Sequence, residues 1–298
     1  MEKKPIVFTG SGVAIITPFT KDGVDYDKLG ELIEYHIAHK TDCIVICGTT
    51  GEASTMPDPE HKAAVEYTAK KAAGRIPVIA GAGSNDTPHA IELCKFCESV
   101  GVDGLLLVTP YYNKTSQKGL YLHYKAIAES VKTPIILYNV PGRTKLSISI
   151  ETLQKLAKID NIVGIKEASG DIAYLSHVAA KVPELSIYSG NDDMIVPAMS
   201  VGGLGVISVA ANIIPEDVHD LCEAYLNGNV KKAMKMQLNM MDLCDKLFIE
   251  VNPIPIKNAM NMLGMNVGDL RMPLCDLEEA NAQKVRQALK DYGLKVVK

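Results

Sequence analysis

The sequence lacks three features that mark common functional classes. It has no excess of positive charge, since 31 lysines and arginines face 35 acidic residues and the net charge is −4, whereas binding to a nucleic-acid backbone needs a basic surface. It has no run of about 18 apolar residues, so we expect no membrane span. It also has neither a GxxxxGK[ST] loop nor a GxGxxG turn, which argues against nucleotide and dinucleotide binding.

The cysteine content does not fit a secreted protein held together by disulfides. The chain has 298 residues and seven cysteines, an odd number, whereas disulfide frameworks usually have an even set in a short chain. Cys94 and Cys97 have the spacing of half a zinc or redox site, but they lie in a helical pattern and no second pair matches them. We interpret them as buried thiols. The N-terminus does not resemble a signal peptide, so we expect a cytoplasmic protein.

The chain does contain a short apolar run, rich in β-branched residues, that recurs eight times. Successive runs begin 19–33 residues apart, and their almost continuous hydrophobicity is typical of parallel strands buried on both faces. Helical patterns fill most of the gaps. The repeated strand–helix order predicts a (β/α)8 TIM barrel over residues 1–228. The runs begin at Val13, Cys43, Ile76, Gly104, Pro134, Ile162, Leu185 and Leu204.

The strand pattern stops after the eighth run. Helical patterns then cover residues 215–228, 229–250, 255–263 and 276–292. The first of these closes the eighth unit. The others predict a C-terminal helical extension over residues 229–298, which we expect to pack under the barrel or to form an oligomer contact.

Lys166 is the most informative residue at a predicted strand end, where barrels of this class carry their catalytic groups. An amine at a barrel mouth loses hydration, which lowers its pKa and makes it a nucleophile. A lysine that reaches solvent or pairs with Glu167 remains the alternative, although adjacent strand residues point to opposite faces. No histidine, cysteine and carboxylate cluster converges at these ends, so we expect no catalytic metal.

Other strand ends carry groups suited to an anionic substrate. The GTTGE turn at 48–52 combines two glycines with two hydroxyls, which can bind a carboxylate or phosphate or can simply form a tight turn. The glycines of 81–83 more simply permit close packing. Tyr138 can relay protons and Arg143 can hold a carboxylate. A core aromatic and a surface charge are the alternatives for these two residues.

These strand ends resemble those of the dihydrodipicolinate synthase family, within the pyruvate-dependent class I aldolases and lyases. The resemblance runs from about Gly10 to Leu294, nearly the whole chain. Its motifs are GTTGE (48–52), RIPVIAGAG (75–83), TPYYNK (109–114), ILYNVPGRT (136–144), GIKEASG (164–170), GVISV (205–209) and NPIPIK (252–257).

The resemblance implies a function and an assembly. Members condense pyruvate with L-aspartate 4-semialdehyde through a lysine Schiff base, at the start of the diaminopimelate and lysine pathway. They need no cofactor and are usually tetramers built from two tight dimers. The resemblance also implies a Schiff base on Lys166 and a proton relay of Tyr138, Thr49 and Tyr112, with Tyr112 reaching in from the neighbouring subunit.

Four further residues of the chain match substrate contacts of the family. Thr50 and the backbone of Ile207 would contact pyruvate, and Arg143 would bind the carboxylate of the semialdehyde. Gly190 is the fourth of these residues, and it lies one residue nearer to Lys166 than its counterpart does in the family.

The family's lysine-sensitive members bind the inhibitor at the tight-dimer interface, and this chain departs from their pattern. Tyr111, Asn85 and His61 match the inhibitor-binding residues. Ala53 stands where a serine is expected, Asp58 where a histidine is, and His89 where a glutamate is. The resemblance therefore implies weak or absent feedback by L-lysine, because a histidine cannot attract the ammonium of the inhibitor.

Two other functions compete with this one. An N-acetylneuraminate-lyase-like or keto-deoxy-sugar aldolase would keep the lysine and the tyrosine but differ around them. The paired threonines 49 and 50, the segment 111–113 and Arg143 favour the synthase. A catalytically silent barrel, kept as a binding protein, should have lost a relay residue or the lysine, and none is missing.

Overall fold

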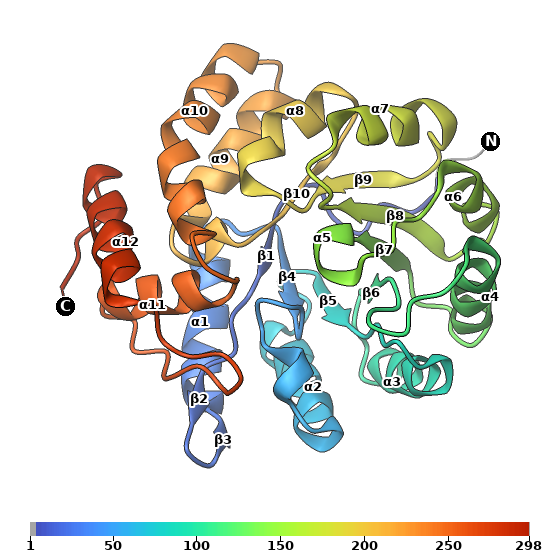
Figure 1. Ribbon diagram of the computed structural model, residues 1–298, viewed down its shortest axis with the longest axis horizontal. Coiled ribbons are helices and arrows are strands. Elements are labelled where there is room, and N and C mark those ends of the chain that lie inside the picture. The colour runs from blue at the N-terminus through green and yellow to red at the C-terminus, as the bar shows by residue number, and fades with distance from the viewer. Residues whose placement is uncertain (1–3, 298) are drawn as a thin grey trace.

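The computed structural model describes residues 4–297 and contains the predicted barrel (Figure 1). Eight parallel strands close in the order β1-β10-β9-β8-β7-β6-β5-β4, so the predicted fold class is confirmed. A hairpin of β2 (Phe19–Thr20) and β3 (Gly23–Val24) follows the first strand. The barrel strands are β1 (Gly10–Ala14), β4 (Cys43–Ile46), β5 (Val78–Gly81), β6 (Gly104–Val108), β7 (Ile135–Asn139), β8 (Ile162–Glu167), β9 (Ser186–Ser189) and β10 (Gly205–Ser208).

Helices surround the strands, and several begin at a residue whose side chain accepts an unpaired backbone N–H of the first turn. Asp25 accepts the N–H of Lys28 at 2.9 Å, and Asp171 accepts that of Ala173 at 2.8 Å. These caps explain why the chain changes from loop to helix at these positions. The barrel helices are α1 (Tyr26–Ala38), α2 (Asp58–Ala72), α3 (Thr87–Ser99), α4 (Gln117–Ala128), α5 (Pro141–Thr144), α6 (Ile150–Leu156), α7 (Ile172–Lys181), α8 (Ile195–Ser200) and α9 (Pro215–Leu226).

The interior of the barrel is filled by side chains, so it is a core and not a pore. Phe8, which precedes the first strand, stacks on Tyr188 with ring centroids 4.4 Å apart, and the Tyr188 hydroxyl donates to the Phe8 carbonyl. Gly81 allows the β4 and β5 ends to approach closely, because a Cβ there would lie 2.1 Å from the Cys47 carbonyl oxygen. This supports the packing interpretation of the glycines at 81–83.

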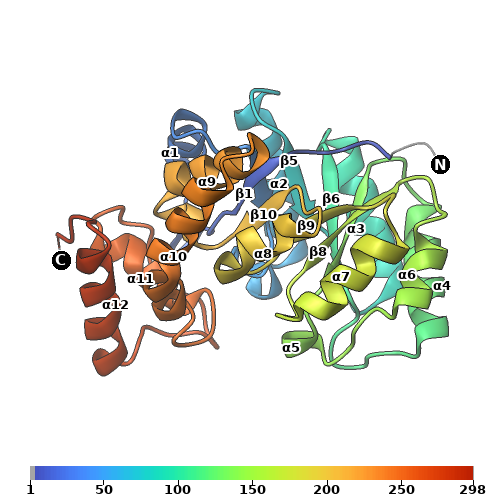
Figure 2. The ribbon, with the colours of Figure 1, turned by 90° about the horizontal axis from the view of Figure 1, so that it is seen from above.

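The C-terminal extension consists of α10 (Val230–Leu247), α11 (Ile254–Met262) and α12 (Glu279–Asp291). It lies along one side of the barrel, with α12 farthest from the strands (Figure 2), and its apolar residues join the core that surrounds the barrel. The expectation that the extension packs under the barrel is wrong for the segment before α11. Asn252 donates to the Thr50 hydroxyl at 3.0 Å, and Thr50 follows the C-terminal end of β4.

The cysteines are thiols, as predicted: all seven are free, and six of them are buried. Burial raises the pKa of Cys97 to about 12 and raises that of Cys94 further. Thiols with such pKa values stay protonated and unreactive at neutral pH. Within residues 4–297, no helix has the length and apolar character needed to cross a membrane.

Candidate active site

A cavity of about 810 Å³ opens at the C-terminal ends of the strands, where the sequence placed the candidate residues. Turns and helices that follow β4, β7, β8 and β9 contribute to its wall, so residues far apart in the chain meet there. Six of the predicted catalytic and substrate-binding residues line it. They are Thr49, Thr50, Tyr138, Arg143, Lys166 and Gly190.

Lys166 lies at the floor of this cavity, in β8, and only 6% of it is exposed. Its Nζ atom is 4.3 Å from the centre of the Tyr138 ring. Burial and the nearby Arg143, against the attraction of Asp192, together lower the pKa of Lys166 to about 8. The neutral amine therefore becomes the main form as the pH rises through about 8, and only this form is a nucleophile.

Glu167 does not pair with Lys166, because the two side chains leave β8 on opposite sides of the strand. The Glu167 carboxylate accepts the side-chain N–H of Asn139 at 2.6 Å and the backbone N–H of Ser169 at 2.5 Å. This removes the ion-pair alternative for Lys166. The amine therefore faces the cavity without a bonded carboxylate.

Tyr138 stands beside Lys166 because β7 pairs with β8 in a register that sets the two residues opposite one another. Burial raises the pKa of Tyr138, while Arg143 and a hydrogen bond with Thr49 lower it in part. The phenol therefore keeps its proton near neutral pH. Thr49 thus bonds the Tyr138 hydroxyl and Lys166 lies over the Tyr138 ring, so the three side chains adjoin one another, and their predicted proton relay stays a prediction.

The GTTGE turn presents its threonines to the cavity. The backbone N–H groups of Gly51, Glu52 and Ala53 donate back to the carbonyls of residues 48 and 49, which closes the turn. Thr49 and Thr50 therefore remain as the donors that can face a bound anion. Thr50 is buried and Thr49 exposed, so the two differ in depth within the cavity.

A buried ion pair that the sequence analysis missed supports this turn from outside. Lys257 of α11 donates to Glu52 at 2.7 Å, and the side chains are 1% and 0% exposed. The second Glu52 oxygen accepts the backbone N–H of Arg271 at 2.9 Å. The only hint in the sequence was the NPIPIK motif, which ends in Lys257.

Arg143 lies on α5 at the mouth of the cavity. One guanidinium nitrogen donates to the Asn252 carbonyl at 2.9 Å. Because Asn252 also donates to the Thr50 hydroxyl, this one residue of the extension links Arg143 and Thr50, two of the four candidates for substrate contact. Asn252 is thus a second residue of the site to which the sequence assigned no role, because only packing or an oligomer contact was expected of the extension.

Gly190 and Ile207 occupy different places. A Cβ at Gly190 would lie 2.6 Å from the Ala168 Cβ and 3.1 Å from the Lys166 Cε, so only glycine fits against the lysine. The fully buried Ile207 belongs to the apolar interior of the barrel, beneath the cavity. Its predicted contact through the backbone stays a prediction.

Tyr112 is the predicted relay residue that the single chain does not bring to the site. Its side chain is 93% exposed and is not part of the cavity wall, and its backbone has a positive φ of 65°. The preceding residue, Tyr111, does line the cavity. The predicted entry of Tyr112 into the site of a neighbouring subunit stays a prediction.

The candidate inhibitor-binding residues line the outer part of the same cavity. His89 places Nε2 3.0 Å from each carboxylate oxygen of Asp58 and Nδ1 3.1 Å from the Ser84 hydroxyl. His61 bonds the Gly81 carbonyl at 2.9 Å, and Asn85 donates to the Tyr111 carbonyl at 3.1 Å. The carboxylate of Asp58 is therefore already occupied by His89.

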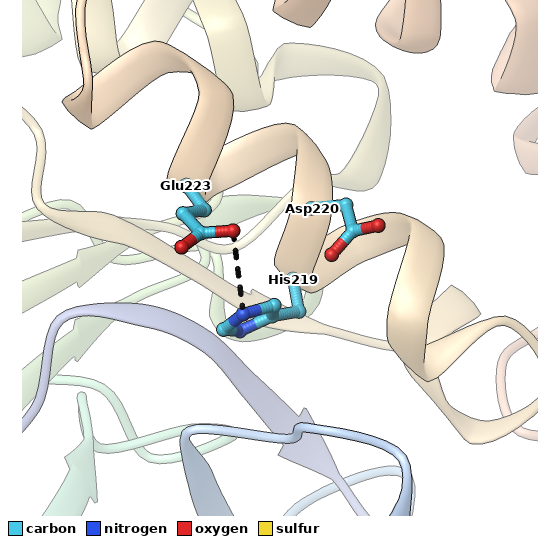
Figure 3. Close-up of side chains that lie close together, drawn as sticks. All are labelled: His219, Asp220 and Glu223. Atoms are coloured by element: carbon cyan, nitrogen blue, oxygen red, sulfur yellow. Dashed lines mark ion pairs between the residues drawn. The ribbon is translucent and has the colours of Figure 1, made fainter.

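A group of three possible metal ligands lies elsewhere, on α9 (Figure 3). His219, Asp220 and Glu223 each offer one atom within 4.8 Å of the others. His219 Nδ1 is 2.9 Å from Asp42, and Lys40 is 3.2 Å from Asp220, so the group is part of an ion-pair network. Asp42 precedes β4, which puts the group at the end of the barrel opposite the cavity. The expected absence of a catalytic metal stays a prediction.

A closed (β/α)8 barrel, with a buried lysine beside a tyrosine in a cavity at its strand ends, has the architecture of a barrel enzyme. The model of the dihydrodipicolinate synthetase family matches residues 7–292. The chain belongs to this family of lyases.

Individual relatives agree over nearly the full chain. The 4-hydroxy-tetrahydrodipicolinate synthase of Acetivibrio thermocellus is 59% identical over 296 residues, which cover 98% of this chain and 99% of the relative. The solved dihydrodipicolinate synthase from Aquifex aeolicus has a TM-score of 0.96 at 45% identity, covering 98% of this chain and 100% of that one. The chloride-inhibited enzyme of Acinetobacter baumannii, solved with pyruvate, has a TM-score of 0.93 at 45% identity, with coverages of 96% and 99%.

Proposed function

We propose that this protein is a 4-hydroxy-tetrahydrodipicolinate synthase that condenses pyruvate with L-aspartate 4-semialdehyde in diaminopimelate and lysine biosynthesis. The observation that carries the proposal is the position of Lys166, buried at the end of β8 with its amine over the Tyr138 ring. The names of the close relatives and the pyruvate in the Acinetobacter neighbour support it. We further propose that it works in the cytoplasm as a homotetramer built from two tight dimers.

The chemistry begins at the Lys166 amine. It adds to the ketone carbon of pyruvate, and loss of one water leaves a protonated imine on the lysine nitrogen. This imine draws electrons from the methyl group, so that a methyl proton can leave and an enamine forms. The chain thus supplies its own electron sink and needs no cofactor. The row of Thr49, Tyr138 and the partner's tyrosine moves the protons.

The second substrate brings the carbon–carbon bond. The enamine carbon attacks the aldehyde carbon of L-aspartate 4-semialdehyde, whose carboxylate Arg143 holds at the cavity mouth. The amino group of the new adduct then attacks the imine carbon and displaces Lys166, which closes the ring and frees the lysine. Overall, one water is lost for each pair of substrates.

A substrate panel tests this function against its alternative. The proposal expects consumption of pyruvate and L-aspartate 4-semialdehyde together, with no cleavage of sialic acid or of keto-deoxy sugars. Cleavage of sialic acid without consumption of the semialdehyde would instead establish an N-acetylneuraminate-lyase-like enzyme.

Replacing Tyr112 by phenylalanine tests the shared site. We expect turnover to fall by about 10²–10⁴-fold, because the relay loses one hydroxyl. Imine formation on Lys166 should persist, because the lysine and pyruvate contacts are unchanged. Steady-state assays and the mass of the borohydride-reduced adduct measure the two effects. A stable monomer with full activity would contradict the shared site.

Feedback by L-lysine is expected to be weak or absent at physiological concentrations. The structure supports this expectation. Asp58 is the only carboxylate among the residues at the inhibitor-binding positions, and both of its oxygens already contact His89. Exchanging His89 for glutamate should tighten inhibition by about 10–100-fold, since it returns a charge-assisted partner for the ammonium. His177→Glu, an exposed change on α7 outside the cavity, is the control. Sub-millimolar inhibition of the unaltered enzyme would contradict the expectation.

A further inference from the structure

Asp192 is a buried carboxylate that the chemistry described above does not use. It begins the short helix η2 (Asp192–Met194), directly after β9, and is 2% exposed. Its Oδ2 atom accepts the backbone N–H groups of Val209 and Ala210 at 3.0 and 2.9 Å. Its Oδ1 atom is buried and accepts no hydrogen bond of ordinary geometry within the part of the chain that the structure describes, although the Ser208 hydroxyl lies close enough to the carboxylate to lower its pKa. A buried, unpaired carboxylate oxygen is costly and calls for an explanation.

The segment that carries Asp192 lies against Lys166. Gly190 leaves room for the lysine, since a Cβ there would be 3.1 Å from the Lys166 Cε. Gly190 also donates its N–H to the Glu167 carbonyl at 2.7 Å, which ties the strand ends together. Two residues further along, the Asp192 carboxylate accepts the backbone N–H of Val209, and Val209 lines the same cavity as Lys166.

The charges around the lysine come from three elements and do not cancel. Tyr138 of β7 contributes a neutral phenol, Arg143 of α5 a positive charge and Asp192 the negative one. Glu167 does not contribute, because its carboxylate is bonded on the other side of β8. Burial raises the pKa of Asp192, while the Ser208 hydroxyl, the two backbone N–H groups and Lys166 lower it.

We propose that Asp192 is a positioning residue whose carboxylate keeps the nitrogen of Lys166 protonated after it has condensed with the keto acid. The inference rests on the proposed function, in which Lys166 forms the imine. Only a protonated imine withdraws electrons strongly enough to release the methyl proton, and an imine nitrogen holds its proton less tightly than an amine does. A fixed anion nearby in a site of low polarity offsets that loss.

A purely structural role for Asp192 is the alternative. Its carboxylate joins the ends of β9 and β10, and its carbonyl accepts the side-chain N–H of Gln237 at 2.8 Å. The variant Asp192→Asn separates the two roles. Its amide oxygen can still accept the N–H groups of Val209 and Ala210, while the negative charge is gone.

The test follows the imine by borohydride trapping with pyruvate between about pH 6 and pH 10, with the adduct measured by mass spectrometry. An opposite charge a few ångströms away raises a lysine pKa by about 1–3 units. Its removal in Asp192→Asn should therefore move the pH range of trapping at least about one unit to lower pH. At pH 8, turnover should fall at least about tenfold.

Asp193→Asn is the matched control. Asp193 is the next residue and exposed, and it does not act on the charge of Lys166, so its pH range of trapping should equal that of the unaltered enzyme. If Asp192→Asn does not fold, Asp192→Ser takes its place, because a serine hydroxyl can accept the same N–H groups. The same shift in the pH range of trapping is then expected.

The outcomes distinguish this inference from the proposed function. No adduct in the unaltered enzyme would overturn the proposed function itself. An adduct in the unaltered enzyme, together with an unchanged pH range in the folded Asp192 variant, would overturn only the role of Asp192. A shift toward lower pH in the Asp192 variant and none in Asp193→Asn would establish it.

Discussion

Lys166→Ala is expected to lower turnover by at least about 1,000-fold and to abolish the adduct that borohydride forms with pyruvate. The amine is the group that we propose becomes the imine, so its removal should take away the covalent route and not one contact among several. In the unaltered enzyme, reduction should add a lactyl-sized mass to the peptide that contains Lys166. The rate of imine formation should rise as the pH passes through about 8, where the lysine loses its proton.

Lys145→Ala is the control for this experiment. Lys145 follows α5 near the cavity mouth and is exposed, so it has an ordinary hydration shell and no reason to act as a nucleophile. The variant should keep both turnover and adduct. An adduct on a lysine other than 166 would refute the assignment.

Lys257→Met is expected to lower the free energy of unfolding by about 3–5 kcal/mol. The change leaves Glu52 buried without its counter-charge, and the uncompensated carboxylate is the cause of the loss. Turnover should fall as well, because Glu52 belongs to the turn that presents Thr49 and Thr50 to the cavity. Denaturant unfolding followed by circular dichroism measures the first effect and a steady-state assay the second.

The double variant Glu52→Gln, Lys257→Met identifies the cause. If the unpaired charge is responsible, the double variant should be more stable than Lys257→Met alone. Lys246→Met, which breaks a pair with Asp242 whose side chains are 28% and 67% exposed, should cost less than about 1 kcal/mol. Equal losses in Lys257→Met and Lys246→Met would show that burial of the first pair has no energetic consequence.

Much of the fold could be predicted because its signals are local. A strand buried on both faces must be almost continuously apolar, and a helix on the surface of the barrel must repeat its apolar residues with a period near 3.6. Eight such strand runs, spaced by helical patterns, leave few arrangements other than a closed barrel. The predicted helices of the extension, 229–250, 255–263 and 276–292, also agree with α10, α11 and α12 to within a few residues.

Part of the candidate site could be predicted for a related reason. Parallel strands of a barrel bring their C-terminal ends to one rim, so Thr49, Tyr138 and Lys166 were expected to meet once the strands were recognised. Contacts that depend on long loops could not be predicted in this way. Asn252 lies 202 residues from Thr50 in the chain, and no periodicity records which side of the barrel the extension covers.

The sequence by itself determined the barrel, the strand ends that form its rim and the lysine that the chemistry needs, because each depends on the type and spacing of neighbouring residues. Only the tertiary structure decided which charges surround that lysine. Glu167, next to Lys166 in sequence, turns away and bonds Asn139. Asp192, 26 positions later, is instead the carboxylate that raises the pKa of the Lys166 amine. The physical reason is that electrostatic interaction depends on distance and burial in space, and separation along the chain specifies neither.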